Sequence, residues 1–224
     1  QALIPPVEEA IAAGVPVAMV DSGIDSDQPV ASIITDQYAG GFMAGEEMAR
    51  LLGEEGLVAN LGIQAGSVSA GRSEGFADAI AQYPNMAVLE TQWTDADAAR
   101  SLNIATDLLT GNPELAGFFS AAAPIAVGID QAAIAKGVDK ELKIVTFDPS
   151  PEILPLFDDG TIQAIIAQDP YQMGYQGVAA IDAFLSGEAI EEPNLELAPV
   201  LITPENVNTD VVQALLQTPD KFEK

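Results

Sequence analysis

The sequence predicts an α/β fold built on parallel sheets that are covered by helices on both faces. Short apolar segments rich in β-branched residues alternate with longer helical patterns along almost the whole chain, and this alternation is typical of βαβ units. With 224 residues and 48% apolar content, the chain is long enough for one large domain or two small ones. We therefore expect a globular protein with a doubly wound parallel sheet.

Strands are expected where a short apolar run stops at polar, Gly or Pro residues. They are predicted over Val15–Val20, Ala31–Thr35, Leu57–Ile63, Met86–Gln92, Leu115–Ser120, Leu142–Phe147, Ile162–Ala167 and Leu197–Thr203. Helices are expected where apolar residues recur with a period near 3.6. They are predicted over Pro5–Ala13, Tyr38–Leu52, Ala70–Gln82, Asp95–Thr110, Pro124–Lys136, Pro151–Phe157, Tyr171–Ser186 and Asp210–Leu216.

Residues at the helix ends support these boundaries. The segment DPSPEIL offers Ser150 as an N-cap with a proline at the first helical position, and QWTDADAAR offers Thr94 as an N-cap. Gly137 and Gly187 suit the left-handed conformation in which many helices end. The glycines of GFMAG indicate close helix packing. The tyrosines of YQMGY, residues 171–175, are four positions apart and are expected to pack their helix against the sheet.

The charge balance restricts the partners. The chain has 34 acidic and 8 basic residues, a net charge of −26. Nucleic acid and anionic membranes attract proteins through Lys and Arg, so we exclude both as partners. Salt screens the repulsion within so acidic a protein, and we expect a halophilic or marine source. No apolar run reaches the ~18–20 residues that a membrane-spanning helix needs.

The absence of His and Cys restricts the chemistry. Without His there is no Ser-His-Asp triad and no imidazole base, and without both residues the usual zinc and thiol chemistries are excluded too. Disulfides are impossible, and we expect no metal and no cofactor. Catalysis would have to use carboxylate, Lys or Tyr groups.

Polar planar groups collect after the predicted strands, where the functional groups of parallel sheets gather. The residues that follow the strands are Asp21, Asp36, Gln64, Trp93, Ala121–Ala123, Asp148 and Gln168. The Asp and Gln side chains among them are polar and planar, and Trp93 is the only tryptophan of the chain. Carboxylates and amides can hydrogen-bond adjacent hydroxyl groups, and an aromatic ring can cover the apolar face of a sugar. The pattern predicts a site for a small polyhydroxyl ligand.

Each of these candidates also has a structural alternative. Asp148 and Asp21 have the alternative of turn residues that bond local backbone. The loop DSGIDSDQPVAS invites a calcium interpretation, but it lacks the Gly and Glu that the EF-hand requires at its sixth and twelfth positions. Arg72 lies at the start of a helix, where a cation opposes the helix dipole. This unfavourable location indicates a functional role, and the alternative is a salt bridge to one of the many acidic residues. Trp93 has the alternative of a half-buried ring at a strand end.

Six segments of the chain together resemble one family. In order they are VPVAMVDSG, IITDQYAGGFMAGEEMA, GRSEGF, LLTGNPELAGFF, IVTFDPSPEI and QDPYQMGYQGV. They resemble the sugar-binding proteins of ABC importers related to ribose-binding protein, which are type I periplasmic binding proteins. The similarity covers nearly all of the chain, and the combination is specific although each segment alone is weak.

The resemblance implies two Rossmann-like lobes joined by hinge crossings, with the sugar enclosed between them. Asp36–Gln37 resembles the first crossing and Gln168–Asp169 the second, so that Gln168 would end a strand and present its amide to the sugar. The resemblance places the ligands of the sugar hydroxyls at Asp21, Arg72, Asp148 and Gln168.

Three departures from the family pattern bear on the ligand. Ser22 stands where ribose binders carry Arg, and Ala122–Ala123 stand where relatives often have Asn-Asp. The stacking Phe of the family matches Ala96, with Trp93 nearby. Because each hydrogen bond to a charged group contributes ~1.5–3 kcal/mol, we expect a ligand other than ribose, such as a differently shaped or less hydroxylated sugar or polyol.

The resemblance also concerns the domain boundaries. The first residues resemble the helix before the fourth strand of the amino-terminal lobe, and the chain opens on Gln1. We therefore expect a fragment, a processed chain or a shortened homologue in which that lobe is incomplete. Residues 1–36 and 169–195 are assigned to this lobe, and 37–168 and 196–224 to the carboxyl-terminal lobe.

The expected function is that of a non-enzymatic receptor that captures a monosaccharide or polyol and delivers it to an ABC importer permease. We expect a monomer that is periplasmic or extracellular, and a lipid anchor in the parent protein stays open. The first alternative is the effector-binding domain of a LacI-type repressor, whose separate headpiece would contact DNA. A second alternative is an enzyme that uses paired carboxylates such as Asp21 and Asp148.

Overall fold

The structure is a computed structural model that describes residues 2–216, and it divides into two compact units. Unit 1 consists of the chain up to Asp36 together with Gln168–Ala198. Unit 2 consists of Gln37–Ala167 and the chain from Pro199 onward. The chain therefore passes from one unit to the other three times.

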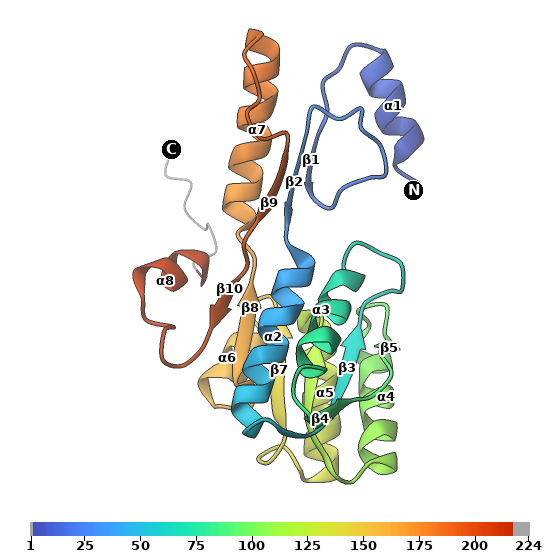
Figure 1. Cartoon of the computed structure of the whole chain (residues 1–224), viewed down its shortest axis with the longest axis vertical. Coiled ribbons are helices and arrows are strands. Elements are labelled where there is room, and N and C mark those ends of the chain that lie inside the picture. Colours follow the sequence, from blue (N-terminus) through green and yellow to red (C-terminus); the bar gives the residue numbers. More distant parts are fainter. Residues whose placement is uncertain (1, 217–224) are drawn as a thin grey trace. The chain divides into compact units, whose positions relative to one another are not determined.

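Unit 2 is built on a sheet of seven strands in the order β10-β8-β7-β6-β3-β4, with β5 also paired to β3 (Figure 1). Every pair is parallel except β10 with β8. The strands are β3 (Glu55–Gly62), β4 (Asn85–Val88), β5 (Gln92–Trp93), β6 (Leu115–Ser120), β7 (Lys143–Phe147), β8 (Ala164–Ala167) and β10 (Val200–Ile202). The predicted parallel α/β architecture is confirmed.

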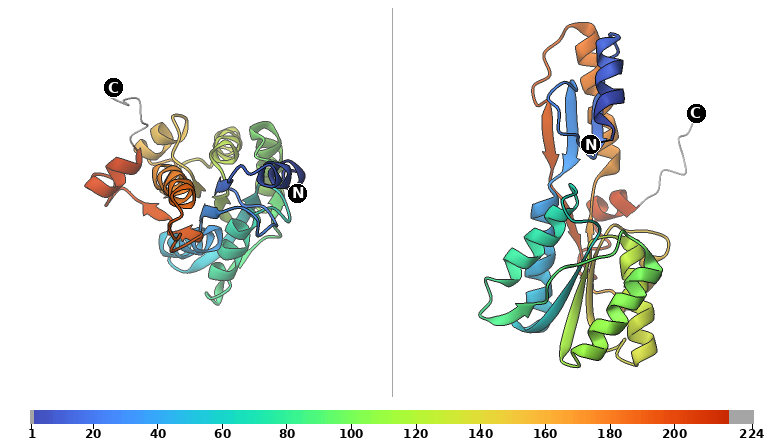
Figure 2. Two further views of the ribbon diagram at one scale, coloured as in Figure 1. Left: turned by 90° about the horizontal axis from the view of Figure 1, so that it is seen from above. Right: turned by 90° about the vertical axis from the view of Figure 1, so that its right-hand side faces the viewer.

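Helices cover both faces of this sheet. They are α2 (Gln37–Leu52), α3 (Ala70–Ile80), α4 (Ala98–Gly111), α5 (Ala123–Lys136), α6 (Ile153–Asp158) and α8 (Asp210–Leu216). Figure 2 (right) shows α2 and α3 on one side of the strands and α4 and α5 on the other. Because both faces are covered, the central strands are almost continuously buried.

The core of unit 2 contains a cluster of buried phenylalanines. The rings of Phe76 in α3 and Phe119 in β6 stack with their centroids 4.6 Å apart. Phe147, the last residue of β7, meets Phe119 edge-on at 6.1 Å. All three side chains are fully buried. The cluster joins α3 to two central strands of the sheet, and it ends at the residue directly before Asp148.

Unit 1 contains a parallel sheet of three strands in the order β1-β2-β9. Its elements are α1 (Ile4–Ala12), β1 (Ala18–Asp21), β2 (Ala31–Thr35), α7 (Pro170–Ser186) and β9 (Asn194–Leu197). Helix α7 packs on β1 and β2. The buried apolar cluster consists of Ala31, Ile33, Met173 and Ala180, so unit 1 has a much smaller core than unit 2.

The structure corrects the predicted strand Leu197–Thr203. Strand β9 ends at Leu197 and pairs with β2 in unit 1, whereas β10 pairs with β8 in unit 2. Pro199, which has no N–H to donate to a ladder, lies between them where the chain changes unit. Residues 196–198 and Gln168 therefore group with unit 1, which differs from the predicted domain boundaries. The predicted strand Met86–Gln92 is likewise divided, into β4 and β5.

Two predicted helix starts are wrong. Helix α4 is capped by Asp97, whose carboxylate accepts a hydrogen bond from Arg100 N at 2.7 Å, because the hydroxyl of Thr94 donates to the carbonyl of Gly62 instead. Helix α6 begins at Ile153, and the Ser150 hydroxyl donates to the Glu152 carboxylate rather than capping the helix. The predicted helix ends at Gly137 and Gly187 are confirmed, with φ of 71° at both.

The predicted packing of Tyr171 and Tyr175 against the sheet is also wrong. Their side chains are 69% and 59% exposed, and their rings stack on each other at 6.4 Å. The face of α7 that is buried carries Met173, Gly177 and Ala180. The tyrosines lie outside that face, and the i, i+4 spacing that they share does not distinguish the two faces of the helix.

Candidate functional site

Polar groups of unit 2 meet at the carboxyl edge of its parallel sheet. Strand β6 ends at Ser120 and leads into Ala121–Ala122, and β7 ends at Phe147 and leads into Asp148. Arg72, from the first turn of α3, reaches the same edge and contacts both segments. Open α/β sheets bind ligands at this edge. The structure therefore brings together three of the predicted site residues, Arg72, Ala122 and Asp148.

The guanidinium of Arg72 is held by four residues. Its Nε donates to the side-chain oxygen of Gln37 at 2.5 Å, and its Nη1 donates to the carbonyl of Ala121 at 2.8 Å. Nη1 also lies 3.5 Å from Oδ2 of Asp148. The ring of Phe147 lies against the guanidinium, 4.1 Å from Cζ to the ring centroid, a cation–π distance. Arg72 is only 6% exposed, so this geometry is fixed by packing on several sides.

Glycines bring Arg72 within reach of Gln37. A Cβ atom at Gly41 in α2 would lie 1.9 Å from the carbonyl oxygen of Arg72, and one at Gly75 in α3 would lie 2.1 Å from that of Tyr38. Neither contact is compatible with a side chain, so the two helices approach at the distance that glycine allows. The predicted close packing of the GFMAG segment explains why an arginine in α3 contacts the first residue of α2.

A buried asparagine fixes the backbone beside Arg72. Asn60, on the central strand β3, is fully buried, and its Nδ2 donates to the carbonyl oxygen of Ser73 at 2.8 Å. This bond ties the first turn of α3 to the sheet. Its Oδ1 and the hydroxyl of Ser73 are buried without a hydrogen-bond partner among the described residues. A buried polar residue on a central strand therefore supports the position of Arg72.

Asp148 presents its carboxylate from a constrained backbone. Its φ of 64° lies in the left-handed region, which Asp tolerates better than most residues. Its N–H donates to the carbonyl of Ile166 at 2.9 Å, which ties the turn to β8. The side chain is 36% exposed, whereas that of Arg72 is 7% exposed. The pair thus offers hydrogen-bond donors and acceptors side by side, which suits adjacent hydroxyl groups.

The segment after β6 carries only methyl side chains. Ala122 precedes α5 with an extended backbone and no side-chain cap. Its carbonyl accepts a hydrogen bond from the Ser120 hydroxyl at 2.7 Å. Ala121 is fully buried and Ala122 is 8% exposed. This part of the edge therefore contributes backbone groups and small apolar side chains, and no side-chain hydrogen bonds.

Trp93 lies on the adjacent strand pair. It is the last residue of β5 and pairs with Gly62 of β3. Its ring packs against that glycine, because a Cβ at Gly62 would lie 2.4 Å from a ring carbon. The loop that follows holds Asp95 and Ala96 at φ of 56° and 54°. Strain of this kind in consecutive non-glycine residues is often found at binding sites.

The other predicted residues belong to unit 1 or to the segments where the chain passes from one unit to the other. Asp21 ends β1 with φ of 68°, a turn like that of Asp148, and Ser22 lies beside it. Asp36 N donates to the carbonyl of Leu197 at 3.0 Å. Gln168 directly follows β8. Asp169 caps α7, accepting a hydrogen bond from Gln172 N at 2.9 Å.

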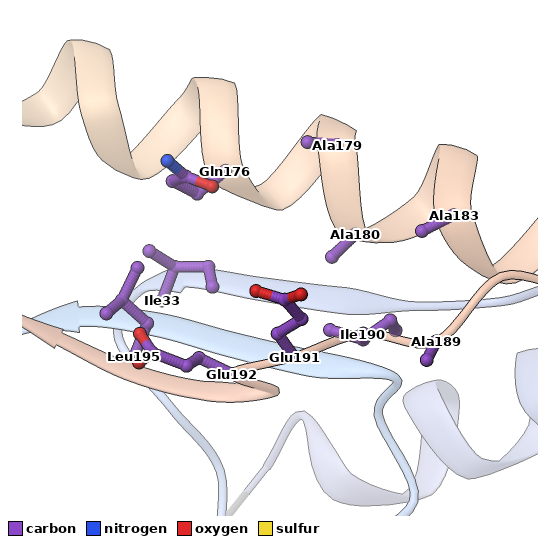
Figure 3. A pocket seen from close by; sticks show the side chains of 10 residues that line it. All are labelled: Ile33, Gln176, Ala179, Ala180, Ala183, Ala189, Ile190, Glu191, Glu192 and Leu195. Carbon is purple, nitrogen blue, oxygen red and sulfur yellow. The ribbon is translucent and has the colours of Figure 1, made fainter.

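Unit 1 also contains a cavity that no prediction anticipated. It has a volume of about 270 Å³ and lies between α7 and the strands β2 and β9 (Figure 3). Ile33, Ala180 and Leu195 form its apolar surface, and Glu191 and Glu192 add carboxylates. None of the predicted site residues lines it.

No group of three or more acidic side chains among residues 2–216 is placed to hold a metal ion. The helices of the same range are too short or too polar to cross a membrane.

Sequence reasoning missed the contact of Gln37. This residue was predicted only as part of a crossing, yet it is 8% exposed and holds the guanidinium of Arg72. The two residues are 35 positions apart. The glycines of α2 and α3 were the only signal that could have indicated this approach.

The chain is similar to known binding proteins over most of its length. A family model described as periplasmic binding protein domain matches residues 1–189. A ribose import binding protein of Escherichia coli is 33% identical over 186 residues, which are 83% of this chain and 62% of that protein. The chain thus spans less than two thirds of the length of this relative.

Solved structures show the same similarity. A solute binding protein of an ABC transporter from Agrobacterium vitis, bound with alpha-D-tagatopyranose, matches with a TM-score of 0.89 at 29% identity, covering 96% of this chain and 76% of that one. A carbohydrate transporter solute binding protein from Agrobacterium radiobacter, in complex with D-arabinose, matches with a TM-score of 0.85 at 33% identity, covering 96% and 75%.

Proposed function

The chain belongs to the family of periplasmic binding protein domains, and from this premise we propose that it is a solute receptor for a monosaccharide or a related polyol. The observation that carries the proposal is the Arg72–Asp148 pair at the carboxyl edge of the unit 2 sheet. A guanidinium and a carboxylate 3.5 Å apart can donate to and accept from neighbouring hydroxyls of one sugar ring. The sugars bound by the similar structures support this ligand class.

The remaining predicted ligands complete the proposal. We propose Asp21 and Gln168 as further ligands, through a carboxylate and an amide, and Trp93 as the residue that covers an apolar face of the sugar. Asp36–Gln37 and Gln168–Asp169 would serve as hinge segments, which is in keeping with the change of unit after Asp36 and after Ala167.

The proposed ligand is a sugar other than ribose. Ser22, Ala96 and Ala122 have small side chains, and Ala122 offers the site no polar side-chain atom. A ligand with fewer hydroxyl groups, or a different shape on that side, would leave fewer of its polar groups without a partner on binding.

The proposed role in the cell is delivery of the sugar to an ABC importer permease, by a monomer located in the periplasm or outside the cell. The name of the Agrobacterium vitis protein supports the transporter connection. We propose that the chain is not an enzyme, because the site offers groups that suit binding and the matching family model is described as a binding protein domain. The comparisons give no support to the repressor alternative.

Calorimetric titration tests the proposal. The chain is titrated with D-ribose, D-arabinose, D-tagatose, further hexoses and polyols, each at several salt concentrations. We expect heat of binding with at least one sugar and a weaker response to D-ribose than to the best ligand. No heat with any of them at any salt concentration would refute the receptor proposal.

A further inference from the structure

We infer that Gln37 is a positioning residue for sugar binding, which fixes the guanidinium of Arg72 without neutralising its charge. The inference rests on the proposed function, since it concerns the residue that holds a proposed ligand group. It assigns to Gln37 a role in affinity in addition to its place at a crossing.

The contact involves Nε, the guanidinium nitrogen that is bonded to Cδ of the side chain. Nε donates to Oε1 of Gln37, while Nη1 donates to the carbonyl of Ala121. Two acceptors on different nitrogens define the plane of the group, and Phe147 lies against it. With rotation about the stem restricted, Nη1 stays within reach of Asp148. A preorganised arginine loses less conformational entropy when it binds a ligand.

Gln37 is itself held in place. It is the first residue of α2 and is 8% exposed. Gly71, the residue before Arg72, lies against it, because a Cβ there would come 3.3 Å from Cβ of Gln37. Gln37 directly follows Asp36, after which the chain enters unit 2. The position of the arginine is thereby tied to the start of that unit.

The choice of an amide over a carboxylate has an electrostatic consequence. A buried carboxylate at position 37 would pair with the guanidinium and reduce the charge that acts on Asp148 and on a ligand. An amide accepts the same hydrogen bond and carries no charge. Glutamine therefore supplies the geometry without adding a further negative charge beside Arg72.

The contact can be tested without any ligand. The chain has only three arginines, Arg50, Arg72 and Arg100, so the Nε–H region of a ¹⁵N NMR spectrum is simple, and Arg72→Lys assigns the signal of interest. We expect a slowly exchanging Arg72 signal in the wild type, its shift or loss in Gln37→Leu, and its retention in Gln37→Glu. The exposed Gln82→Leu is the matched control and should leave it unchanged.

Gln37→Asn serves as a second variant in case Gln37→Leu fails to fold. A failure to fold would change the Arg50 and Arg100 signals as well as that of Arg72. The shorter side chain withdraws the acceptor by one methylene, so the same change of the Arg72 signal is expected. An Arg72 signal that exchanges rapidly in the wild type, or that is unaffected by both variants, would overturn the inference.

Sugar titration separates this inference from the proposed function. For whichever panel sugar the wild type binds, Gln37→Leu is expected to weaken affinity by about 10-fold or more, and to have no further effect in an Arg72→Ala background. Unchanged affinity in Gln37→Leu would overturn the positioning role alone. No binding by the wild-type chain would instead overturn the proposed function, whatever the arginine spectrum shows.

Discussion

Arg72 Nη1 lies 3.5 Å from Oδ2 of Asp148, although 76 residues separate the two in the sequence. The two side chains differ in exposure, 7% for the arginine and 36% for the aspartate. The cation is therefore held more closely by the protein, and the carboxylate is the more accessible of the two groups. At 3.5 Å the contact is long for a hydrogen bond, and we propose that the pair serves sugar binding.

Asp148→Asn is expected to separate binding from folding. Asn tolerates the left-handed backbone at this position, so the melting temperature should stay close to that of the wild type. The loss of a charged acceptor should weaken sugar binding by about 10-fold to 100-fold. Calorimetry and thermal unfolding measure the two effects.

Asp148→Ala is the matched comparison, because alanine at φ of 64° adds a backbone cost of about 1–2 kcal/mol. It should lose both affinity and stability. Equal sugar affinity in Asp148→Asn and the wild type would remove Asp148 from the site.

Gly75→Ala is expected to destabilise unit 2 and to weaken binding together. The new methyl group would lie 2.1 Å from the carbonyl oxygen of Tyr38, so α3 must move away from α2, at a cost of about 1–3 kcal/mol or more. Arg72 moves with α3. The control is Gly111→Ala at the end of α4, where no atom lies within 4 Å and a gain of a few tenths of a kcal/mol is expected. Similar unfolding midpoints for the two variants would contradict the close-packing explanation.

Asp130 is expected to lower stability as the pH rises. It is 8% exposed in α5, and its pKa is raised by burial, with further contributions from the carboxylates of Asp159 and Asp139. Because the folded-state pKa lies above the unfolded value, protonation favours the fold, and stability falls as the pH rises from the ordinary aspartate range through the raised pKa. Asp130→Asn should raise the melting temperature at pH 7 and give a smaller gain near pH 4. A gain that grows as the pH falls would show that the sign is wrong.

The two units are expected to differ in stability. Unit 2 buries large residues such as Phe118, Ile144 and Ile165, whereas the buried cluster of unit 1 has four members, two of them alanines. Amides of β6 and β7 should therefore exchange with deuterium more slowly than those of β1 and β2. Equal protection in both sheets would indicate that the units unfold together.

Salt is expected to stabilise the chain. At a net charge of −26 the folded state repels itself, and higher ionic strength shortens the range of that repulsion. The melting temperature should rise steadily between about 0.1 and 1 M NaCl. A fall over this range would argue against a protein adapted to high salt.

Much of the fold followed from local pattern. The strand and helix runs were recognisable because parallel strands buried on both faces are almost wholly apolar, as β6, β7 and β8 are. The pattern failed where tertiary pairing decides the outcome. Residues 197–203 form an apolar run, but their partners lie in two different sheets, and the sequence carries no information on partners beyond the proline between the two strands.

The site was predictable only in part, and for the same reason. Strand ends pointed to Asp148, and an unfavourable place at a helix start pointed to Arg72. The hydrogen bond between Gln37 and Arg72 depends on how closely α2 and α3 approach. Gly41 and Gly75 allow this approach, although neither residue takes part in the hydrogen bond. The outward face of Tyr171 and Tyr175 depends on which side of α7 meets the strands. Neither follows from spacing along one helix.

A crystal structure of the chain grown with its tightest-binding panel sugar would examine the proposed site most directly. We expect sugar hydroxyl oxygens about 2.6–3.2 Å from the guanidinium of Arg72 and from the carboxylate of Asp148. A sugar bound away from both residues would contradict the account.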